Sequence, residues 1–216
     1  MGVKLNFWKQ RLGSVPEFVW ATGDVETLVL ADNDLAEVPD RFGDLKGLRM
    51  LDLGHNRLTT VPDSLGDLDG LTDFLYLHDN GLTSLPASLG NLTRLKYFNV
   101  SDNPLEEFPN CVCGMSSLVE LRLCDNRLTS LPESIVRLSR LRELHLRNNR
   151  LTSLPAAIGG LCELRLLDLR GNPLSELPEG VRSLPKLEKL DLRWVSTLKL
   201  PPWTAELEAR GCLVYC

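Results

Sequence analysis

The chain has 216 residues, of which 43% are hydrophobic and 25% are charged, values typical of a folded protein rather than a disordered one. Its 29 acidic residues outnumber its 24 basic ones, and the net charge of −5 argues against a general nucleic-acid or anionic-membrane binder. No segment reaches the ~20 apolar residues of a membrane helix, and the first residues lack a secretion signal. We therefore expect a cytoplasmic protein with no membrane or nucleic-acid partner.

The N-terminal segment, residues 1–24, predicts a partial structural unit that caps the fold. Its stretch KLNFWKQRL follows the leucine spacing of the later segments, with Gln10 at the position of their recurring asparagine and Pro16 at that of their recurring proline. Terminal units of repeat proteins depart from the consensus in this way because one of their faces meets solvent.

Residues 25–186 contain seven full repeats of one pattern. Asparagines recur every 23 residues, except for a step of 24 between Asn56 and Asn80. The complete unit is L-x-x-L-x-L-x-x-N-x-L-x-x-L-P-x-x-I-G-x-L. The recurring asparagines are Asn33, Asn56, Asn80, Asn103, Asn126, Asn149 and Asn172.

Each unit predicts a short strand, a turn and a return segment. In LRELHL (141–146), Leu144 and Leu146 point inward, and Glu143 and His145 face outward. Successive strands would stack in parallel ~4.8 Å apart, with each asparagine amide satisfying backbone groups where the chain turns away. Proline starts the return segment, whose apolar column packs onto the sheet: Phe42, Leu65, Leu89, Val112, Ile135, Ile158 and Val181.

This pattern resembles the leucine-rich repeat family over almost the whole chain. The L-P-x-x-I-G-x-L form is similar to an intracellular subgroup that includes plant Ras-group-related and bacterial repeat proteins. The resemblance implies an α/β solenoid, a curved arc with a parallel β-sheet on its concave side and short helical or 3-10 segments on its convex side. It also implies a single domain over residues 1–216 that binds a protein partner.

Residues 187–216 predict a degenerate last repeat and a C-terminal cap. Val195 replaces the asparagine, so the asparagine column ends there. The stretch PPWTAELEARG predicts a short helix that begins at proline and ends at Gly211. We expect this helix to cover the last strand and hide its open edge.

The longer step falls in LTDFLYLHDNGL (71–82), which also carries aromatic residues that the repeat does not require. We predict a bulge between Leu71 and Leu75 that presents Phe74 and Tyr76 on the concave side. Met50 and Tyr97 would lie beside them and complete a candidate partner-binding patch. Two alternatives stay open: the rings serve cross-strand packing, or Phe74 turns inward as part of the core.

The remaining candidate partner-binding residues lie further along the predicted concave face: Asn99, Arg122, His145, Arg147 and Arg170. Arg147, Arg170 and Arg193 follow one column beside acidic residues, which indicates either a solvated ladder of alternating charge or a rim that steers an acidic partner segment. The adjoining turn column is acidic at Asp32, Asp79, Asp102 and Asp125.

We predict no catalytic residue, metal site or cofactor. Repeats and caps account for the chain from Val3 to Tyr215, and no Walker loop, H-E-x-x-H or G-x-S-x-G motif is present. His55 and His78 fall in adjacent units, but a metal would need further ligands, so hydrogen-bonded or solvated histidines are expected. The six cysteines are expected to be free thiols: Cys111, Cys113, Cys124, Cys162, Cys212 and Cys216.

The sequence thus predicts a monomeric, non-catalytic protein–protein interaction module that binds a partner on its concave face. The alternative is a regulatory inhibitor or effector that blocks an enzyme or a signalling protein. A third possibility is a purely structural spacer.

Overall fold

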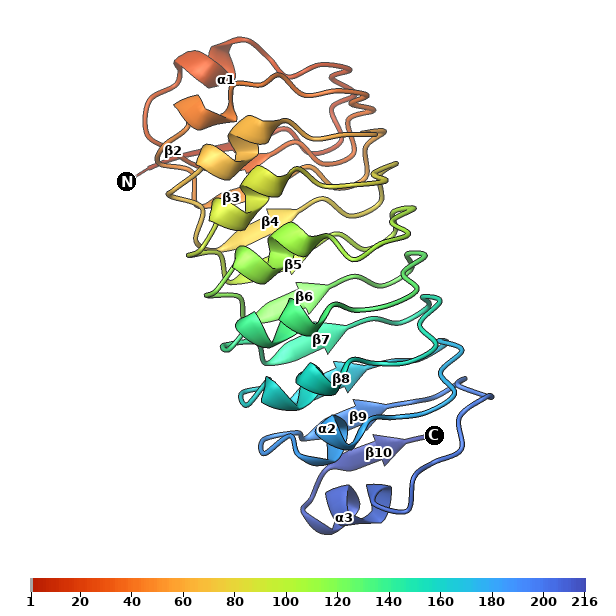
Figure 1. Ribbon diagram of the computed structural model, residues 1–216. Coiled ribbons are helices and arrows are strands. Elements are labelled where there is room, and N and C mark those ends of the chain that lie inside the picture. The colour runs from red at the N-terminus through yellow and green to blue at the C-terminus, as the bar shows by residue number, and fades with distance from the viewer. Residues whose placement is uncertain (1) are drawn as a thin grey trace.

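The computed structural model describes residues 2–216, which build a stack of similar turns (Figure 1). Within this range, ten parallel strands form one sheet in which strands that follow one another in sequence are neighbours in space. The strands are β1 (Val3–Asn6), β2 (Val25–Val29), β3 (Met50–Asp52), β4 (Phe74–Tyr76), β5 (Tyr97–Asn99), β6 (Glu120–Arg122), β7 (Glu143–His145), β8 (Leu166–Asp168), β9 (Lys189–Asp191) and β10 (Leu213–Tyr215).

Short helices occupy the return segments on the other side of each turn (Figure 1). Most begin directly after the recurring proline, whose fixed φ and extended ψ place it before the first helical residue, as Pro132 does (φ −78°, ψ 153°). The helices are α1 (Phe18–Ala21), η1 (Phe42–Asp44), η2 (Asp63–Asp67), η3 (Ala87–Asn91), η4 (Asn110–Gly114), η5 (Glu133–Arg137), η6 (Ala156–Gly160), α2 (Glu179–Arg182) and α3 (Thr204–Ala209). In residues 2–216 no helix has the length and apolar character needed to cross a membrane.

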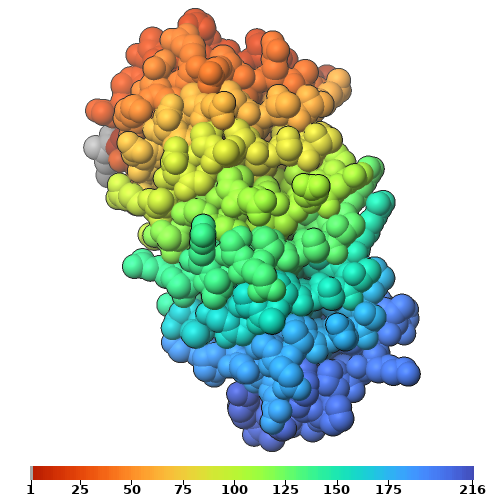
Figure 2. Space-filling view, viewed as in Figure 1, coloured from red at the N-terminus to blue at the C-terminus, as the bar shows by residue number. Residues whose placement is uncertain are grey.

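The core is a continuous column of apolar side chains between the sheet and the helices. The middle residue of each central strand points inward and is fully buried, as Leu121 and Leu144 are. The predicted apolar column from Phe42 to Val181 is also fully buried at all seven positions. Each such side chain contributes roughly 1.5–3 kcal/mol relative to leaving it in water. Residues close in sequence lie in successive bands along the stack (Figure 2), so each turn packs mainly against the turn before it and the turn after it.

The asparagine column ties successive turns together, as the sequence predicts. Asn126 is 6% exposed, and its Nδ2 donates to the carbonyl oxygens of Val100 (3.1 Å) and Leu123 (3.2 Å). Its Oδ1 accepts from the backbone N–H of Leu105 at 3.3 Å. The same amide therefore satisfies buried backbone groups of two neighbouring repeats, each of which would cost about 1–3 kcal/mol if left unpaired.

A second column, one residue before the asparagines, is left-handed throughout. Asp102 has φ 56° and Asp125 has φ 55°, a region that Asp, Asn and Gly enter at less cost than other residues. The acidic turn column seen in the sequence therefore has a conformational cause. Its members are Lys9, Asp32, His55, Asp79, Asp102, Asp125, Asn148, Gly171 and Trp194.

The C-terminal end differs from the sequence prediction. The helix α3 is present, but it does not cover the last strand alone, because the chain turns at Gly211 (φ 90°) and adds β10 parallel to β9. The backbone N–H of Leu213 donates to the carbonyl oxygen of Glu188 at 2.8 Å. The expected helical cap is therefore a helix followed by one more strand. The three-residue strand carries no repeat pattern that could have predicted it.

Candidate functional site

The extra residue between Asn56 and Asn80 forms a bulge at the start of β4. Val119, directly before β6, donates its N–H to the residue directly before β5, Lys96 (2.8 Å). By the same rule the backbone N–H of Lys96 would donate to Asp73, the residue directly before β4. It donates instead to the carbonyl oxygen of Thr72 (3.2 Å), one residue earlier. The strand register is unaffected, since Leu75 still pairs with Leu51 and remains fully buried. The predicted position of the bulge is confirmed.

Phe74 lies on the concave surface and not in the core, since it is 41% exposed. Its ring stacks on Tyr76 with centroids 5.9 Å apart and planes 11° apart, and it lies 5.4 Å from Tyr97. The two tyrosine rings are 5.1 Å apart, and Met50 pairs with Phe74 in the neighbouring strand. We call Met50, Phe74, Tyr76 and Tyr97 the aromatic patch.

The aromatic patch combines packing with exposure to water. Burial raises the pKa of Tyr97 to about 12, so its hydroxyl stays protonated and uncharged at neutral pH. The patch therefore presents apolar rings and neutral hydroxyl groups, the chemistry found at the energetic centre of protein interfaces. The rings also contribute to cross-strand packing, because those of Phe74, Tyr76 and Tyr97 all contact one another.

The next predicted residues continue the row of Tyr76 across the sheet. Strand pairing places Asn99 beside Tyr76, Arg122 beside Asn99 and His145 beside Arg122. Each already has a partner within the chain. Asn99 Oδ1 accepts from the N–H of Ser101 (3.0 Å), and Arg122 Nε donates to Glu120 Oε1 (2.5 Å). This row is adjacent to the patch but is less free to rearrange.

The arginine column contacts carboxylates of the same chain. Arg147 Nη2 donates to Asp125 Oδ2 (2.7 Å), and Arg170 makes two bonds to Asp168, of 2.8 and 2.6 Å. This supports the ladder of alternating charge over an unpaired basic rim. We call Asp168, Asp191, Arg170 and Arg193 the ion-pair ladder.

Asp191 is the most enclosed carboxylate of the ion-pair ladder, with an exposed fraction of 0%. Arg193 bonds it through Nε (2.9 Å) and Nη2 (2.7 Å), and Arg170 Nε lies 3.6 Å away. Burial alone would raise the pKa of Asp191, but hydrogen bonds from Arg193 and the charge of Arg170 outweigh burial and hold that pKa below its ordinary value.

Trp194 adds an aromatic surface that the sequence analysis did not identify as a candidate. It is 70% exposed, and the guanidinium groups of Arg170 and Arg193 lie 6.0 and 5.8 Å from its ring. A bulky residue one position before the asparagine column was the available signal, because six of the nine residues in that left-handed column are Asp, Asn or Gly.

Two histidines lie in contact beside the patch. His55 Nε2 and His78 Nε2 are 3.2 Å apart, and His55 Nδ1 lies 2.5 Å from Asp79 Oδ2. Burial, followed by the neighbouring His55, lowers the pKa of His78, which favours its neutral form. Two nitrogen donors alone do not make a closed metal site.

In residues 2–216, one group combines three donors close enough for a metal ion: Glu120, Glu143 and His145. His145 Nε2 lies 3.1 Å from Glu143 Oε2, and Glu120 is already held by Arg122. Burial lowers the pKa of His145, and the hydrogen bond to Glu143 opposes that shift. These contacts let the trio act as an internal hydrogen-bonded cluster of the concave face.

The C-V-C pair lies in η4 on the convex side. Burial raises the pKa of the Cys111 thiol to about 11, and burial also raises the pKa of Cys113, whose Sγ contacts the hydroxyl of Ser134 at 3.3 Å. At neutral pH both thiols are therefore protonated and weakly nucleophilic.

Comparisons with known proteins agree with this geometry. A leucine rich repeat family model matches residues 24–82, 73–128 and 116–174. No curated protein matches the chain. Among solved structures, a leucine-rich repeat protein of Leptospira interrogans is similar at 31% identity and a TM-score of 0.86 over 94% of this chain. The match covers 52% of that protein, so this chain spans about half its length.

Two receptor structures are also similar. The ectodomain of the membrane receptor kinase GASSHO1/SCHENGEN3 from Arabidopsis thaliana, in complex with Casparian strip integrity factor 2, has 31% identity and a TM-score of 0.77. That match covers 88% of this chain and 24% of the receptor. A TDR receptor has 21% identity and a TM-score of 0.78, over 93% of this chain and 40% of its own, and it shows likeness of fold alone.

Proposed function

The chain belongs to the leucine-rich repeat family, and from this premise we propose that it is a non-catalytic module whose concave face binds a partner protein. The fold is typical of protein–protein interaction modules, because a curved sheet displays many side chains in regular columns. The Arabidopsis neighbour, solved in complex with Casparian strip integrity factor 2, is an example of a similar fold with a bound partner.

The aromatic patch carries this proposal. Its strands need only their inward apolar residues, Leu51, Leu75 and Phe98, and the asparagine column, so Phe74, Tyr76 and Tyr97 are not required by the repeat. Phe74 nevertheless stands 41% exposed, and its ring touches those of Tyr76 and Tyr97. Large rings of this kind bury much area at small cost in side-chain entropy, and a partner that covers them gains most of its binding energy there.

Several further properties belong to the same proposal. We place the chain in the intracellular subgroup with the L-P-x-x-I-G-x-L form, as a monomeric cytoplasmic domain that uses no cofactor. The full partner-binding set is Met50, Phe74, Tyr76, Tyr97, Asn99, Arg122, His145, Arg147 and Arg170. Within it, the patch supplies the affinity and the polar residues supply orientation.

The test compares three immobilised forms of the protein in extracts of the source organism, with quantitative mass spectrometry of what each retains. The forms are the wild type, Tyr76→Ala with Tyr97→Ala, and Val136→Ala, whose exposed apolar side chain lies on the convex side in η5. A concave-face partner is retained by the wild type and the Val136 variant and is lost by the double variant. Equal recovery on all three forms would refute the proposed face.

The alternative function, a regulatory inhibitor or effector, uses the same surface. It is distinguished by adding the purified protein to the captured partner. Inhibition of an enzyme by the wild type but not by the double tyrosine variant would favour this alternative over simple scaffolding.

A further inference from the structure

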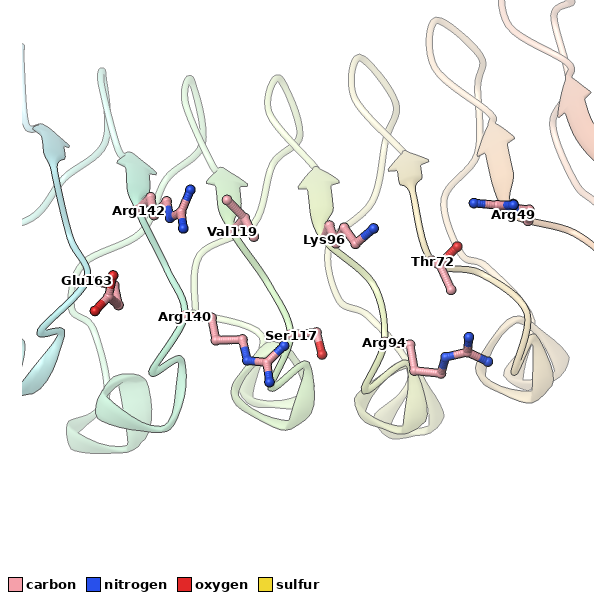
Figure 3. A pocket seen from close by; sticks show the side chains of 9 residues that line it. All are labelled: Arg49, Thr72, Arg94, Lys96, Ser117, Val119, Arg140, Arg142 and Glu163. Atoms are coloured by element: carbon pink, nitrogen blue, oxygen red, sulfur yellow. The ribbon is translucent and has the colours of Figure 1, made fainter.

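A second surface lies at the edge of the sheet where the strands begin, away from the asparagine turns. It is a groove of about 770 Å³ lined by Arg49, Thr72, Arg94, Lys96, Ser117, Val119, Arg140, Arg142 and Glu163 (Figure 3). Five of these nine side chains are cationic and one is anionic, in a chain whose net charge is −5. The groove therefore concentrates positive charge against the overall balance of the molecule.

The groove arises because long cationic and short side chains alternate between neighbouring repeats. The β5 repeat supplies Arg94 and Lys96, and the β7 repeat supplies Arg140 and Arg142. The β6 repeat between them has only Ser117 and Val119 at the matching positions. Figure 3 shows Arg140 and Arg142 extending toward these two short residues. The cationic repeats lie roughly 10 Å apart, twice the spacing of adjacent strands.

The same columns are charge-balanced in the later repeats. Arg165 Nη1 lies 2.6 Å from Glu188 Oε1, and Lys186 Nζ lies 2.5 Å from Glu163 Oε1. Glu163, the one acid that lines the groove, is therefore already paired outside it. In these later repeats, Glu163 and Glu188 thus join neighbouring repeats along this edge.

At one place in the groove, a carboxylate of the chain already lies between cations of neighbouring repeats. We call this place, before β4, the first hollow. Asp73, directly before β4, places its carboxylate 3.2 Å from Arg49 Nη2 and 4.0 Å from Lys96 Nζ. The equivalent position before β6 is Val119, which has no charge. We call the space over Ser117 and Val119 the second hollow. The first hollow thus shows how a carboxylate sits between cations of adjacent repeats, and the second hollow lacks that carboxylate.

Among residues 2–216, three of the four cations around the second hollow have no acidic partner, since only Lys96 reaches a carboxylate, that of Asp73 at 4.0 Å. Across residues 2–216, Arg140 and Arg142 form no ion pair, and Arg94 reaches only the backbone oxygen of Asp69 at 3.4 Å. Like charges held this close repel one another unless an anion lies between them. Guanidinium groups favour carboxylates, which they bind through paired hydrogen bonds.

We propose that this groove binds an extended acidic segment of a partner protein, with a carboxylate over Ser117 and Val119 in the place that Asp73 takes in the β4 repeat. Successive side chains of an extended segment point to opposite sides, so adjacent acidic residues would meet the cations of the β5 and β7 repeats. A short peptide fits better than a nucleic acid, because the groove spans few repeats and the turn column at the other end of the strands is acidic. This proposal does not depend on the aromatic patch.

The test uses fluorescein-labelled hexaglutamate, with labelled hexaglutamine as the neutral reference, in anisotropy titrations at low ionic strength. We expect binding of hexaglutamate alone, weakened about tenfold by Arg140→Gln with Arg142→Gln. The matched control is Arg127→Gln with Arg150→Gln, which removes the same charge from exposed residues beside the asparagine turns and should change affinity less than about twofold.

A second pair of variants tests the hollow itself. Val119→Asp supplies the missing carboxylate within the chain, so it should weaken hexaglutamate binding about tenfold. Val119→Asn, similar in size and uncharged, should retain binding. Thermal unfolding of both variants shows whether the fold is kept. Tyr76→Ala with Tyr97→Ala should leave hexaglutamate affinity unchanged, which separates this proposal from the concave-face function.

Three outcomes would overturn the proposal. The first is no binding of hexaglutamate by the wild type. The second is equal weakening by the Arg127 and Arg150 control, which would indicate diffuse charge attraction. The third is groove-dependent binding of a single-stranded oligonucleotide or of phosphatidylserine vesicles without binding of hexaglutamate, which would assign the groove to a different class of partner.

Discussion

Two regions of one concave surface use the same strand positions in opposite ways. Tyr76 on β4 and Asp168 on β8 occupy one row of the sheet, separated by Asn99, Arg122 and His145. At β4 and β5 the row and its neighbours carry rings that touch one another and water. At β8 and β9 they carry carboxylates whose charges are held by arginines of the same repeats. A partner can cover the rings without breaking a bond inside the chain, whereas covering the ion-pair ladder would disturb bonds already made.

The largest expected effect concerns the binding half of this comparison. Tyr76→Ala with Tyr97→Ala should weaken partner binding by more than about 2 kcal/mol, because it removes two interface anchors. The free energy of unfolding should fall by about 1 kcal/mol or less, since both rings lie outside the main core. Isothermal titration with the captured partner and urea unfolding measure the two quantities. If the free energy of unfolding fell as much as the free energy of binding, the main role of the patch would be packing within the fold.

The second effect concerns the ion-pair ladder. Asp191→Ala should lower the free energy of unfolding by about 1–3 kcal/mol, because Arg193 and Arg170 lose their shared acceptor, although both cations keep some access to water. Asp52→Ala is the matched control in the same row. Asp52 accepts one backbone bond, from Gly54 (2.9 Å), and forms no ion pair among residues 2–216. An equal loss in both variants would show that the ladder adds nothing.

The third effect follows from the lowered pKa of Asp191. A carboxyl group whose pKa is lower in the folded state stabilises the fold above its unfolded pKa of about 3.9, and that contribution disappears as the pH falls through the folded pKa. The wild type should therefore lose stability more steeply below about pH 4 than Asp191→Asn does. Urea unfolding as a function of pH measures the difference.

Asp102 gives the opposite sign and serves as the control for that measurement. Burial and the neighbouring Asp125 and Asp79 raise the pKa of Asp102, so its ionised form opposes folding, and acidification through that raised pKa relieves the cost. Asp102→Asn should therefore remove the gain in stability that protonation of Asp102 brings on acidification, and should leave the loss of stability due to Asp191 unchanged. Parallel changes in the Asp191 and Asp102 variants would contradict the assignment of partners.

The smallest effect is on the histidine beside the patch. The rings of Tyr76 and His78 are 5.9 Å apart, and burial is the main reason for the lowered pKa of His78. Tyr76→Ala should admit water and raise the pKa of His78 toward its ordinary value, as followed by NMR titration. The pKa of His145, three strands away from Tyr76, should stay constant in the same variant.

The sequence predicts the fold well because each consensus residue has one structural task. Leu144 can only serve the core and Asn126 can only serve the turn, so spacing alone locates strands, turns and helices. The addition of β10 could not be predicted, because Leu213–Tyr215 follows no repeat and pairs only after a turn at Gly211.

The candidate site is predicted less completely, because surface roles depend on neighbours. Spacing located the bulge, and the structure then placed Phe74 outside the core. Spacing could not reveal whether Arg170 is free or paired, since that depends on the side-chain positions of Asp168 and Asp191. The groove over Val119 was missed because its signal is a short side chain between long ones.

The left-handed column has a consequence for how this surface varies between related sequences. A position held near φ 55° accepts Asp, Asn or Gly with little strain, so the set of tolerated residues is small whatever the surface binds. Asp102 and Asp125 would then persist, or exchange with Asn and Gly, under selection for a foldable backbone alone. Constancy in this column should be discounted when partner specificity is inferred from aligned relatives, and change at Phe74, Tyr76 and Tyr97 should be given more weight.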